Sequence, residues 1–296
     1  MSDEWKKQSE RSNTFTLKLI AWIALHTGRR ITRLFLYPIV LYFYIAAPTA
    51  RKASFYYLSR VFGRPARQIE IARHIYWFAA TILDRVYFLT DQLDKLEIKI
   101  NNFDVVEKYK NDKQGVMLLG SHFGSFEAMR SLAQTGAEIP LKILMYQNHN
   151  QMITRILAEL NPQVAASVID LSQMDALIKM HEAIEAGYMI GMLGDRVTEN
   201  DKIIPCQLLG SEANFPAGPM LVASIIKKPV ILFYCLYMGK NRYEIYFEEL
   251  AERIDVPRSD RESKIAYWTQ LYVEKLEFYI KKSPYNWFNF YNFWHD

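Results

Sequence analysis

From residue 115 onward, the chain alternates between short apolar runs and segments whose apolar residues recur every three or four positions. Runs of the first kind predict buried strands, and segments of the second kind predict amphipathic helices. The pattern predicts strands at residues 116–120, 141–146, 164–169, 188–193, 203–209, 230–238 and 243–248, and helices at residues 125–134, 151–160, 174–186, 219–227 and 259–282. This alternation predicts an α/β fold with a mostly parallel, mixed sheet flanked by helices.

The chain before residue 115 has a different pattern. Residues 64–91 carry apolar side chains at helical spacing and predict one long helix. Upstream of it are two apolar stretches, at residues 19–25 and 34–47, and the second is interrupted by Pro38. A helix needs about 20 apolar residues to cross a bilayer, so neither stretch predicts a simple span. We expect residues 1–62 to form a membrane-associated helical segment and residues 63–296 to form the α/β domain.

Charge is distributed unevenly along the chain. Residues 1–75 contain 13 Lys and Arg but only 4 Asp and Glu, a net charge of +9, whereas the whole chain has a net charge of +4. A segment that is both basic and apolar, without the spacing of a nucleic-acid module, is typical of a protein that lies on an anionic membrane surface. The alternative is a buried helical hairpin that packs on the main domain, and the two interpretations are compatible.

Composition and motifs limit the kinds of chemistry that we expect of this protein. The two cysteines, Cys206 and Cys235, lie far apart in apolar surroundings, which indicates core residues in a reducing compartment rather than a disulfide or a metal site. The chain has no Gly-x-Gly-x-x-Gly, no P-loop and no His/Cys cluster with ligand spacing. The sequence therefore predicts no metal, no cofactor and no nucleic-acid partner.

A strand, a tight turn and the start of a helix are predicted at residues 115–127, and the turn contains His122. Glu127 follows five residues later, near the start of the predicted helix, where it would be ionised and could orient His122 as a base. The N–H groups of residues 123–125 could face an oxyanion. A His-x4-Asp/Glu pair is expected about 0.6 times by chance in a chain with six histidines and 32 acidic residues among 296. A purely structural turn histidine therefore stays open as an alternative.

The same turn argues against a serine nucleophile. A serine hydrolase of the α/β type needs Gly-x-Ser-x-Gly, but the window Gly120-Ser-His-Phe-Gly124 has histidine at its centre. A simpler interpretation is that the base activates a hydroxyl of a bound acceptor, which attacks an acyl thioester directly. A second polar turn, Gly194-Asp195-Arg196, also follows a predicted strand. Ligands of open α/β sheets bind at such strand ends.

These residues resemble the bacterial lipid A late-acyltransferase family, within the lysophospholipid acyltransferase superfamily. The hallmark His-x4-Asp/Glu (HxxxxE) of that family is matched by His122 and Glu127. The apolar and basic N-terminal segment, the Gly194-Asp-Arg196 turn, the Pro/Gly block at residues 209–219 and the aromatic ending at residues 284–294 follow in the order of the family plan. The likeness covers nearly the whole chain.

The resemblance implies a fatty-acyl transferase bound peripherally at the cytoplasmic face of the inner membrane. It implies acyl-[acyl carrier protein] as donor, and as acceptor a hydroxyl of a lipid A-like or other glycolipid. His122 would be the base and Glu127 its orienting partner. Asp195, Arg196 and Ser125 would lie on the substrate side, since an arginine can bind a phosphate through two hydrogen bonds. For Asp195 and Arg196 the alternative is a local ion pair at a strand end.

Two alternatives to acyl transfer remain open at this point. The first is a catalytically silent lipid-binding protein on the same fold, and the second is a thioesterase or other hydrolase in which water replaces the acceptor. The seven aromatic residues between Tyr285 and Trp294 could line an acyl groove. We expect them instead to pack the end of the chain into the core.

Overall fold

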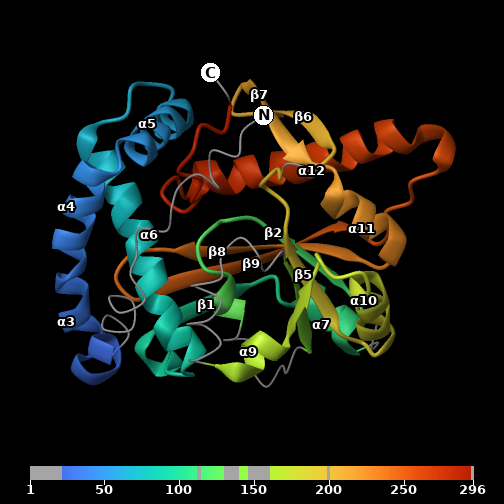
Figure 1. Ribbon diagram of the computed structural model, residues 1–296, viewed down its shortest axis with the longest axis horizontal. Coiled ribbons are helices and arrows are strands. Elements are labelled where there is room, and N and C mark those ends of the chain that lie inside the picture. The colour runs from blue at the N-terminus through green and yellow to red at the C-terminus, as the bar shows by residue number, and fades with distance from the viewer. Residues whose placement is uncertain (1–21, 112–114, 130–139, 146–160, 199–200, 295–296) are drawn as a thin grey trace.

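The computed structural model describes residues 22–111, 115–129, 140–145, 161–198 and 201–294 (Figure 1). Its centre is a seven-stranded sheet in the order β1-β9-β8-β2-β5-β3-β4. The strands are β1 Glu97–Asn101, β2 Met117–Gly120, β3 Leu141–Met145, β4 Val168–Asp170, β5 Met189–Leu193, β8 Val230–Tyr237 and β9 Arg242–Ala251. Only β8 and β9 pair antiparallel, and the other neighbours pair parallel. The predicted mostly parallel, mixed sheet is confirmed.

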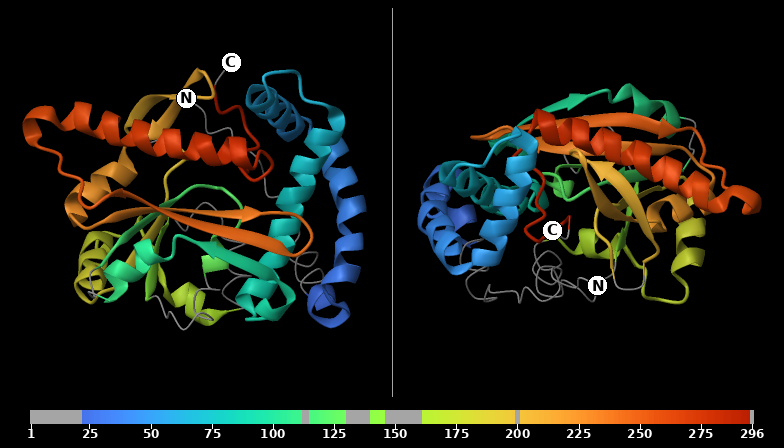
Figure 2. Two further views of the ribbon diagram at one scale, coloured as in Figure 1. Left: turned by 180° about the vertical axis from the view of Figure 1, so that it is seen from behind. Right: turned by 90° about the horizontal axis from the view of Figure 1, so that it is seen from above.

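The helices lie on both faces of this sheet. Their bounds are α3 Arg29–Leu34, α4 Leu36–Ala46, α5 Pro48–Phe62, α6 Gln68–Leu89, α7 Asp104–Asn111, α9 Pro162–Ala166, α10 Ala176–Glu185, α11 Gly218–Ile226 and α12 Arg261–Lys282. Figure 2 shows the long helix α12 running across one face of the sheet, with the helices α3 to α6 gathered at one side. The sheet is therefore flanked by helices, as the sequence pattern predicts.

Alternate residues of the central strands enter two separate cores. In β2, Met117 and Leu119 join a core with α10, α11 and α12, whereas Leu118 joins a second core with β1, α7 and the end of α6. All four residues of β2 and all eight of β8 are buried. Strands covered on both faces read as continuous apolar runs, because neither face meets water. This explains why β2 and β8 are visible in the sequence.

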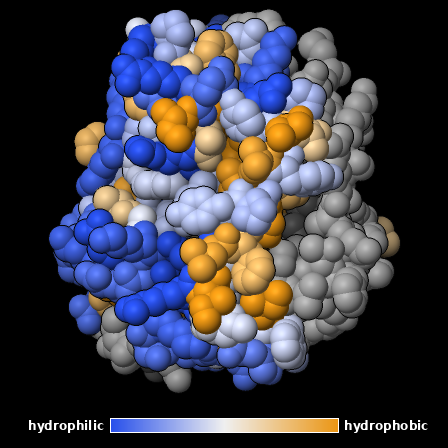
Figure 3. Space-filling view, turned by 90° about the vertical axis from the view of Figure 1, so that its left-hand side faces the viewer, coloured by the Kyte–Doolittle hydropathy of each residue, from blue (hydrophilic) through white to orange (hydrophobic). Residues whose placement is uncertain are grey.

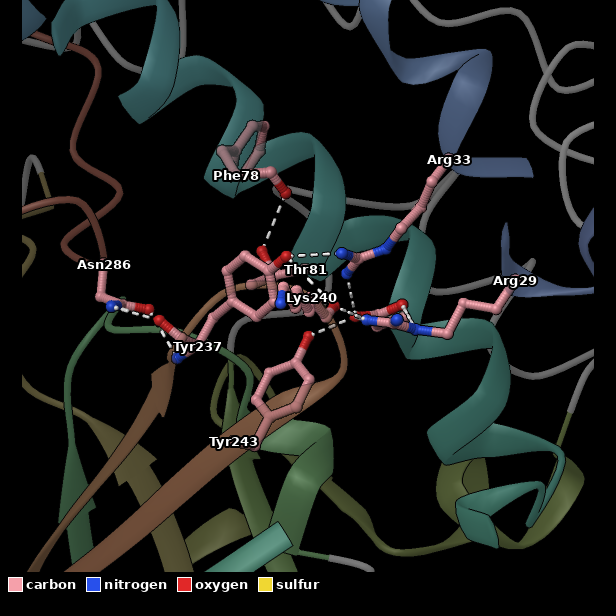
Figure 4. A network of polar contacts seen from close by, with 9 residues as sticks. Arg29, Arg33, Phe78, Thr81, Tyr237, Lys240, Tyr243 and Asn286 are labelled. Carbon is pink, nitrogen blue, oxygen red and sulfur yellow. Dashed lines mark hydrogen bonds and ion pairs between the residues drawn. The ribbon is translucent and has the colours of Figure 1, made fainter. Parts of the chain in front are cut away.

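The N-terminal helices are tied to the sheet by a buried ionic network (Figure 4). Arg29 and Arg33 of α3 bind the carboxylate of Asp84 on α6, at 2.7 and 2.9 Å. Tyr243 of β9 donates to the same carboxylate at 2.8 Å, and Arg33 donates to Tyr237 of β8 at 2.6 Å. Two basic residues of the segment expected to lie on an anionic membrane surface therefore point inward, because they neutralise a buried aspartate.

The outer surface of α3 and α4 carries a strip of exposed, large apolar side chains, which we call the α3–α4 strip. Its members are at least 48% exposed and are Ile31, Leu34, Phe35, Tyr37, Leu41, Tyr42 and Ile45. Figure 3 looks onto this side of the molecule and shows hydrophobic side chains gathered along it. In the described part of the chain no single helix is long and apolar enough to cross a bilayer. The residues 29–46 and 48–62 meet that criterion only as a pair bent by 95°.

Several predicted elements differ from the structure. The strand at residues 203–209 exists as β6 Ile203–Leu208, but it pairs with an unpredicted strand, β7 Ser211–Pro216, in a separate antiparallel ribbon. Residues 162–166, at the start of the strand predicted for residues 164–169, are helical, and β4 begins only at Val168. The strand β1 and helix α7 were not predicted. The helix predicted at residues 151–160, and residues 130–134 of another, lie outside the described residues.

Candidate active site

His122 lies in a bend two residues beyond the end of β2. The bend is held against β8 by Gly124, which has a positive φ of 66° and bridges to Cys235. A Cβ atom at Gly124 would lie only 1.5 Å from the carbonyl oxygen of Cys235. No residue other than glycine fits this close approach and this backbone conformation. The glycine thus fixes where the bend, and with it His122, leaves the sheet.

The structure brings the two polar turns together. Parallel strands β2 and β5 are neighbours in the sheet, with Gly120 opposite Leu193. Asp195 follows β5 by two residues, so the turns after both strands meet at the same edge. Nδ1 of His122 lies 2.8 Å from Oδ1 of Asp195. The backbone N–H of His122 also donates to both carboxylate oxygens of Asp195, at 3.0 and 3.1 Å.

The carboxylate of Asp195 is fully buried but surrounded by donors. Its Oδ2 accepts hydrogen bonds from Nε1 of Trp287 at 2.9 Å and from Nδ2 of Asn289 at 3.0 Å. Burial alone would raise the pKa of Asp195. The charge and hydrogen bond of His122, together with Arg196 and Asn289, outweigh burial and hold the pKa of Asp195 well below its usual range. Asp195 is therefore an ionised acceptor.

An ionised acceptor fixes the tautomer of His122. Because the carboxylate of Asp195 can only accept, the ring proton of neutral His122 sits on Nδ1, and Nε2 carries the free lone pair. The side chain of His122 is 30% exposed, and the described residues supply no hydrogen bond to Nε2. Burial lowers the pKa of His122 below its usual value, and Arg196 adds to this effect while Asp195 opposes it. The ring is therefore an unprotonated base near neutral pH.

Glu127 has different neighbours. Its Oε2 accepts a hydrogen bond from Oγ of Ser125 at 2.8 Å and lies 3.1 Å from Nε of Arg85 on α6. Residues 126–129 form a short 3₁₀ turn. Among the described residues, no hydrogen bond or ion pair joins Glu127 to His122, because Nδ1 of His122 is taken by Asp195. The predicted orienting contact is thus made by Asp195, from the neighbouring turn, and not by Glu127.

Arg196 is held by the end of the chain. Its Nε donates to Oδ1 of Asn289 at 2.9 Å, and its Nη2 donates to the carbonyl oxygen of Phe288 at 2.9 Å. The side-chain amide of Asn289 thus bridges Arg196 and Asp195. The role predicted for Arg196, binding a substrate phosphate, stays a prediction.

The expected oxyanion donors are largely engaged elsewhere. The N–H of Phe123 donates to the carbonyl oxygen of Ser121 at 2.6 Å, and the N–H of Gly124 donates to that of Asn286 at 2.9 Å. An oxyanion needs donors that are free to point at it. The expectation that the whole of residues 123–125 offers such donors is therefore wrong for Phe123 and Gly124.

The aromatic ending of the chain packs into the core, as predicted. Trp287, Phe288, Phe293 and Trp294 are all less than 9% exposed. Sequence reasoning missed that this segment also completes the site through Trp287 and Asn289, which lie 92 and 94 residues from Asp195 along the chain. Asn289 stands between two phenylalanines. A polar side chain inside a buried aromatic run needs a partner, and that was the available signal.

The cysteines and the acidic residues do not suggest further chemistry. Cys206 and Cys235 are buried free thiols, as predicted, and burial raises the pKa of each to about 12. Within the described ranges no group of three or more His, Cys, Asp or Glu is arranged to hold a metal ion.

Comparison with known proteins identifies the family. None of the curated proteins matches the chain. The model of one family, described as bacterial lipid A biosynthesis acyltransferase, matches residues 14–296. This match spans the N-terminal helices, the sheet with His122 and Asp195, and the aromatic ending, so it covers every segment that carries the resemblance. The chain belongs to the bacterial lipid A biosynthesis acyltransferase family.

Proposed function

We propose that this protein moves a fatty acyl chain from acyl-[acyl carrier protein] to a hydroxyl of a lipid A-like or other glycolipid acceptor, with His122 as the general base. Membership of the family supports acyltransferase activity. The observation that carries the mechanism is the 2.8 Å contact between Nδ1 of His122 and the buried carboxylate of Asp195. This contact leaves the free lone pair on Nε2 of His122, whose side chain is 30% exposed.

The proposed reaction has two proton transfers, both through Nε2 of His122. Nε2 takes the proton from the acceptor hydroxyl as its oxygen attacks the carbonyl carbon of the donor thioester. The C–S bond of the tetrahedral intermediate then breaks, and His122 returns the proton to the departing thiolate of the carrier. Asp195 keeps the imidazole in the required tautomer and stabilises its protonated form between the two transfers.

Direct transfer to the acceptor fits the neighbouring serines. Ser121 is 5% exposed and Ser125 is fully buried. Ser125 also donates its hydroxyl proton to Glu127. A serine nucleophile must reach the substrate carbonyl and have its proton taken by the base. Burial keeps both serines from a substrate, and the hydroxyl of Ser125 is bound to Glu127, which supports an acceptor hydroxyl as the nucleophile and argues against Ser125 as a substrate-binding residue.

Glu127 has a different role in this proposal. It joins Ser125 to Arg85 of α6 and so braces the turn behind His122. We expect its removal to loosen that turn rather than to remove the partner of the base. Its direct action on His122, which the family hallmark implies, stays a prediction.

We place the protein peripherally at the cytoplasmic face of the inner membrane, with the α3–α4 strip in contact with lipid. Exposed large apolar side chains on this scale mark an interaction surface. Vesicle flotation with anionic lipid tests this placement. The double substitution Leu34→Glu and Leu41→Glu should release the protein from vesicles. Leu177→Glu, at an exposed leucine of α10, should not. Equal binding of wild type, the double variant and Leu177→Glu to vesicles would refute the placement.

The function is tested by measuring loss of donor thioester and acylation of the acceptor together. We expect wild type to acylate the acceptor and His122→Gln to lose about 10²- to 10⁴-fold in rate, the usual contribution of a general base. The control is His181→Gln, at an exposed histidine of α10. Thioester loss without need of an acceptor would indicate a thioesterase. Acceptor or carrier binding without turnover in wild type would indicate a silent lipid-binding protein.

A further inference from the structure

The aromatic ending of the chain contacts the site as well as the core. Phe123 and Trp287 form an antiparallel bridge. The N–H of Phe288 donates to the carbonyl oxygen of His122 at 2.8 Å. We call residues 284–289 the C-terminal clamp. It holds His122 by its backbone and Asp195 by two side chains, so it touches both members of the catalytic pair.

The clamp is anchored independently of the site. Tyr57 of α5 donates to the carbonyl oxygen of Pro284 at 2.7 Å. Nε2 of His74 on α6 lies 3.0 Å from the carbonyl oxygen of Trp287, while Nδ1 of His74 lies 2.8 Å from Oγ of Ser54. A carbonyl only accepts, so Nε2 of His74 carries the proton and Ser54 donates to Nδ1. Buried, fully paired contacts of this kind fix the backbone from which Trp287 projects.

The two side chains of the clamp and the imidazole of His122 bind different oxygens of the Asp195 carboxylate. Trp287 and Asn289 both donate to Oδ2, whereas Nδ1 of His122 is bound to Oδ1. With Oδ2 held by two fixed donors, the carboxylate cannot rotate without breaking hydrogen bonds. Oδ1 is thereby presented to the imidazole in one orientation.

We propose that Trp287 and Asn289 are positioning residues that act on His122 through Asp195. The proposal rests on the proposed function, because it concerns the same base. Neither residue is required to touch a substrate. Their effect is on the orientation and proton affinity of His122, which a merely structural residue would leave unchanged.

The direction of the effect follows from electrostatics. A donor to Oδ2 draws negative charge away from the carboxylate and weakens its stabilisation of a protonated imidazole. Without the indole N–H, more negative charge stays on the carboxylate of Asp195, where it stabilises protonated His122. Trp287→Phe should therefore raise the pKa of His122 and move the acidic limb of the pH–rate profile to higher pH. It should also lower kcat by roughly 10- to 100-fold, the factor for one hydrogen bond to a charged group.

The experiment compares Trp287→Phe with Trp294→Phe in the full-length protein. Trp294 is a second buried tryptophan of the same ending, and its indole donates to the carbonyl oxygen of Leu208 instead. Histidine-selective ¹⁵N NMR reports the tautomer and pKa of His122, and donor–acceptor turnover reports kcat. We expect a raised pKa and reduced kcat for Trp287→Phe, and wild-type values for Trp294→Phe.

Two results would overturn the proposal. One is a His122 tautomer, pKa and kcat in Trp287→Phe equal to those of Trp294→Phe. The other is an equal loss of kcat in both variants with no change at His122. If Trp287→Phe does not fold, Asn289→Ser takes its place, and the tautomer of His122 in that variant is the readout. The NMR readout does not depend on the reaction, so it separates failure of the clamp from failure of the acyltransferase proposal.

Discussion

Two aspartates in this molecule, Asp84 and Asp195, are both fully buried and both ringed by donors, yet they are suited to different tasks. Asp84 binds two guanidinium groups, those of Arg29 and Arg33, and the hydroxyl of Tyr243 (Figure 4). Asp195 binds one imidazole, one indole, one side-chain amide and the backbone N–H of His122. The number of hydrogen bonds is similar, but the charge that neutralises each carboxylate is not.

The difference lies in what the partner can do with a proton. A guanidinium does not exchange its proton in the way an imidazole does, so the centre at Asp84 is an ion pair that fastens α3 to α6. An imidazole gains and loses a proton near neutral pH, and His122 is also 30% exposed, so the centre at Asp195 has the properties that the proposed proton transfers require. The partner of each buried carboxylate is thus the reason for assigning a structural task to Asp84 and proposing a catalytic one for Asp195.

Of the two aspartates, Asp195 is expected to have the larger effect on rate, and Asp195→Asn tests it. The amide cannot stabilise a protonated His122 and favours the wrong tautomer, so kcat should fall by an amount that approaches, but does not exceed, the loss in His122→Gln, about 10²- to 10⁴-fold. Turnover of donor and acceptor measures this directly. Glu127→Gln serves as the matched control, since Glu127 contacts Ser125 and Arg85. If Glu127→Gln lost more activity than Asp195→Asn, the two carboxylates would have to exchange roles.

The largest effect on stability is expected from Asp84→Asn. Removing this carboxylate leaves two guanidinium groups that are only 11% and 12% exposed without their counter-charge. Breaking a buried ion pair in this way costs about 3–5 kcal/mol in the free energy of unfolding. Urea denaturation measures the loss. Activity per folded molecule should remain, and a specific loss of kcat with unchanged stability would break the distinction between the two centres.

A smaller effect is expected in the pH dependence. His122 must be unprotonated to act, so the rate falls as pH drops through its pKa, which burial and Arg196 lower below the usual value of about 6.5. More than half of the maximal kcat/KM should therefore persist at a pH of about 6.5. Asp84→Asn should not shift the acidic limb of the pH–rate profile. A limb centred above the usual histidine pKa would contradict the environment described for His122.

The sequence predicts the parts of this molecule that depend on local pattern. Buried strands such as β2 and β8 appear as continuous apolar runs, and α12 appears by its helical periodicity. The strand β6 was predicted but its pairing with β7 in a separate ribbon was not, because hydrophobic periodicity and composition do not say which strands pair. The strand β1 was missed because it lies at the sheet edge with exposed charged residues, so its apolar signal is weak.

The candidate site likewise has parts that the sequence predicts and parts that depend on tertiary contacts. His122 and the turn containing Asp195 are visible in the sequence as polar residues at strand ends. Their contact is not, because it depends on β2 and β5 being neighbours although they are separated by β3 and β4 along the chain. Glu127 was paired with His122 by its spacing, by its place near the start of the predicted helix and by the family hallmark, and none of these reports a tertiary contact. Trp287 and Asn289 reach Asp195 through tertiary packing of the chain end, which no local pattern reports.

The most direct test of the central claim is a double-mutant cycle in kcat between His122→Gln and Asp195→Asn. If Asp195 acts only through His122, its substitution has no further effect once the imidazole is gone. The double variant should then turn over no more slowly than His122→Gln alone. If the two losses multiply instead, Asp195 acts independently of His122, and the proposed pair is contradicted.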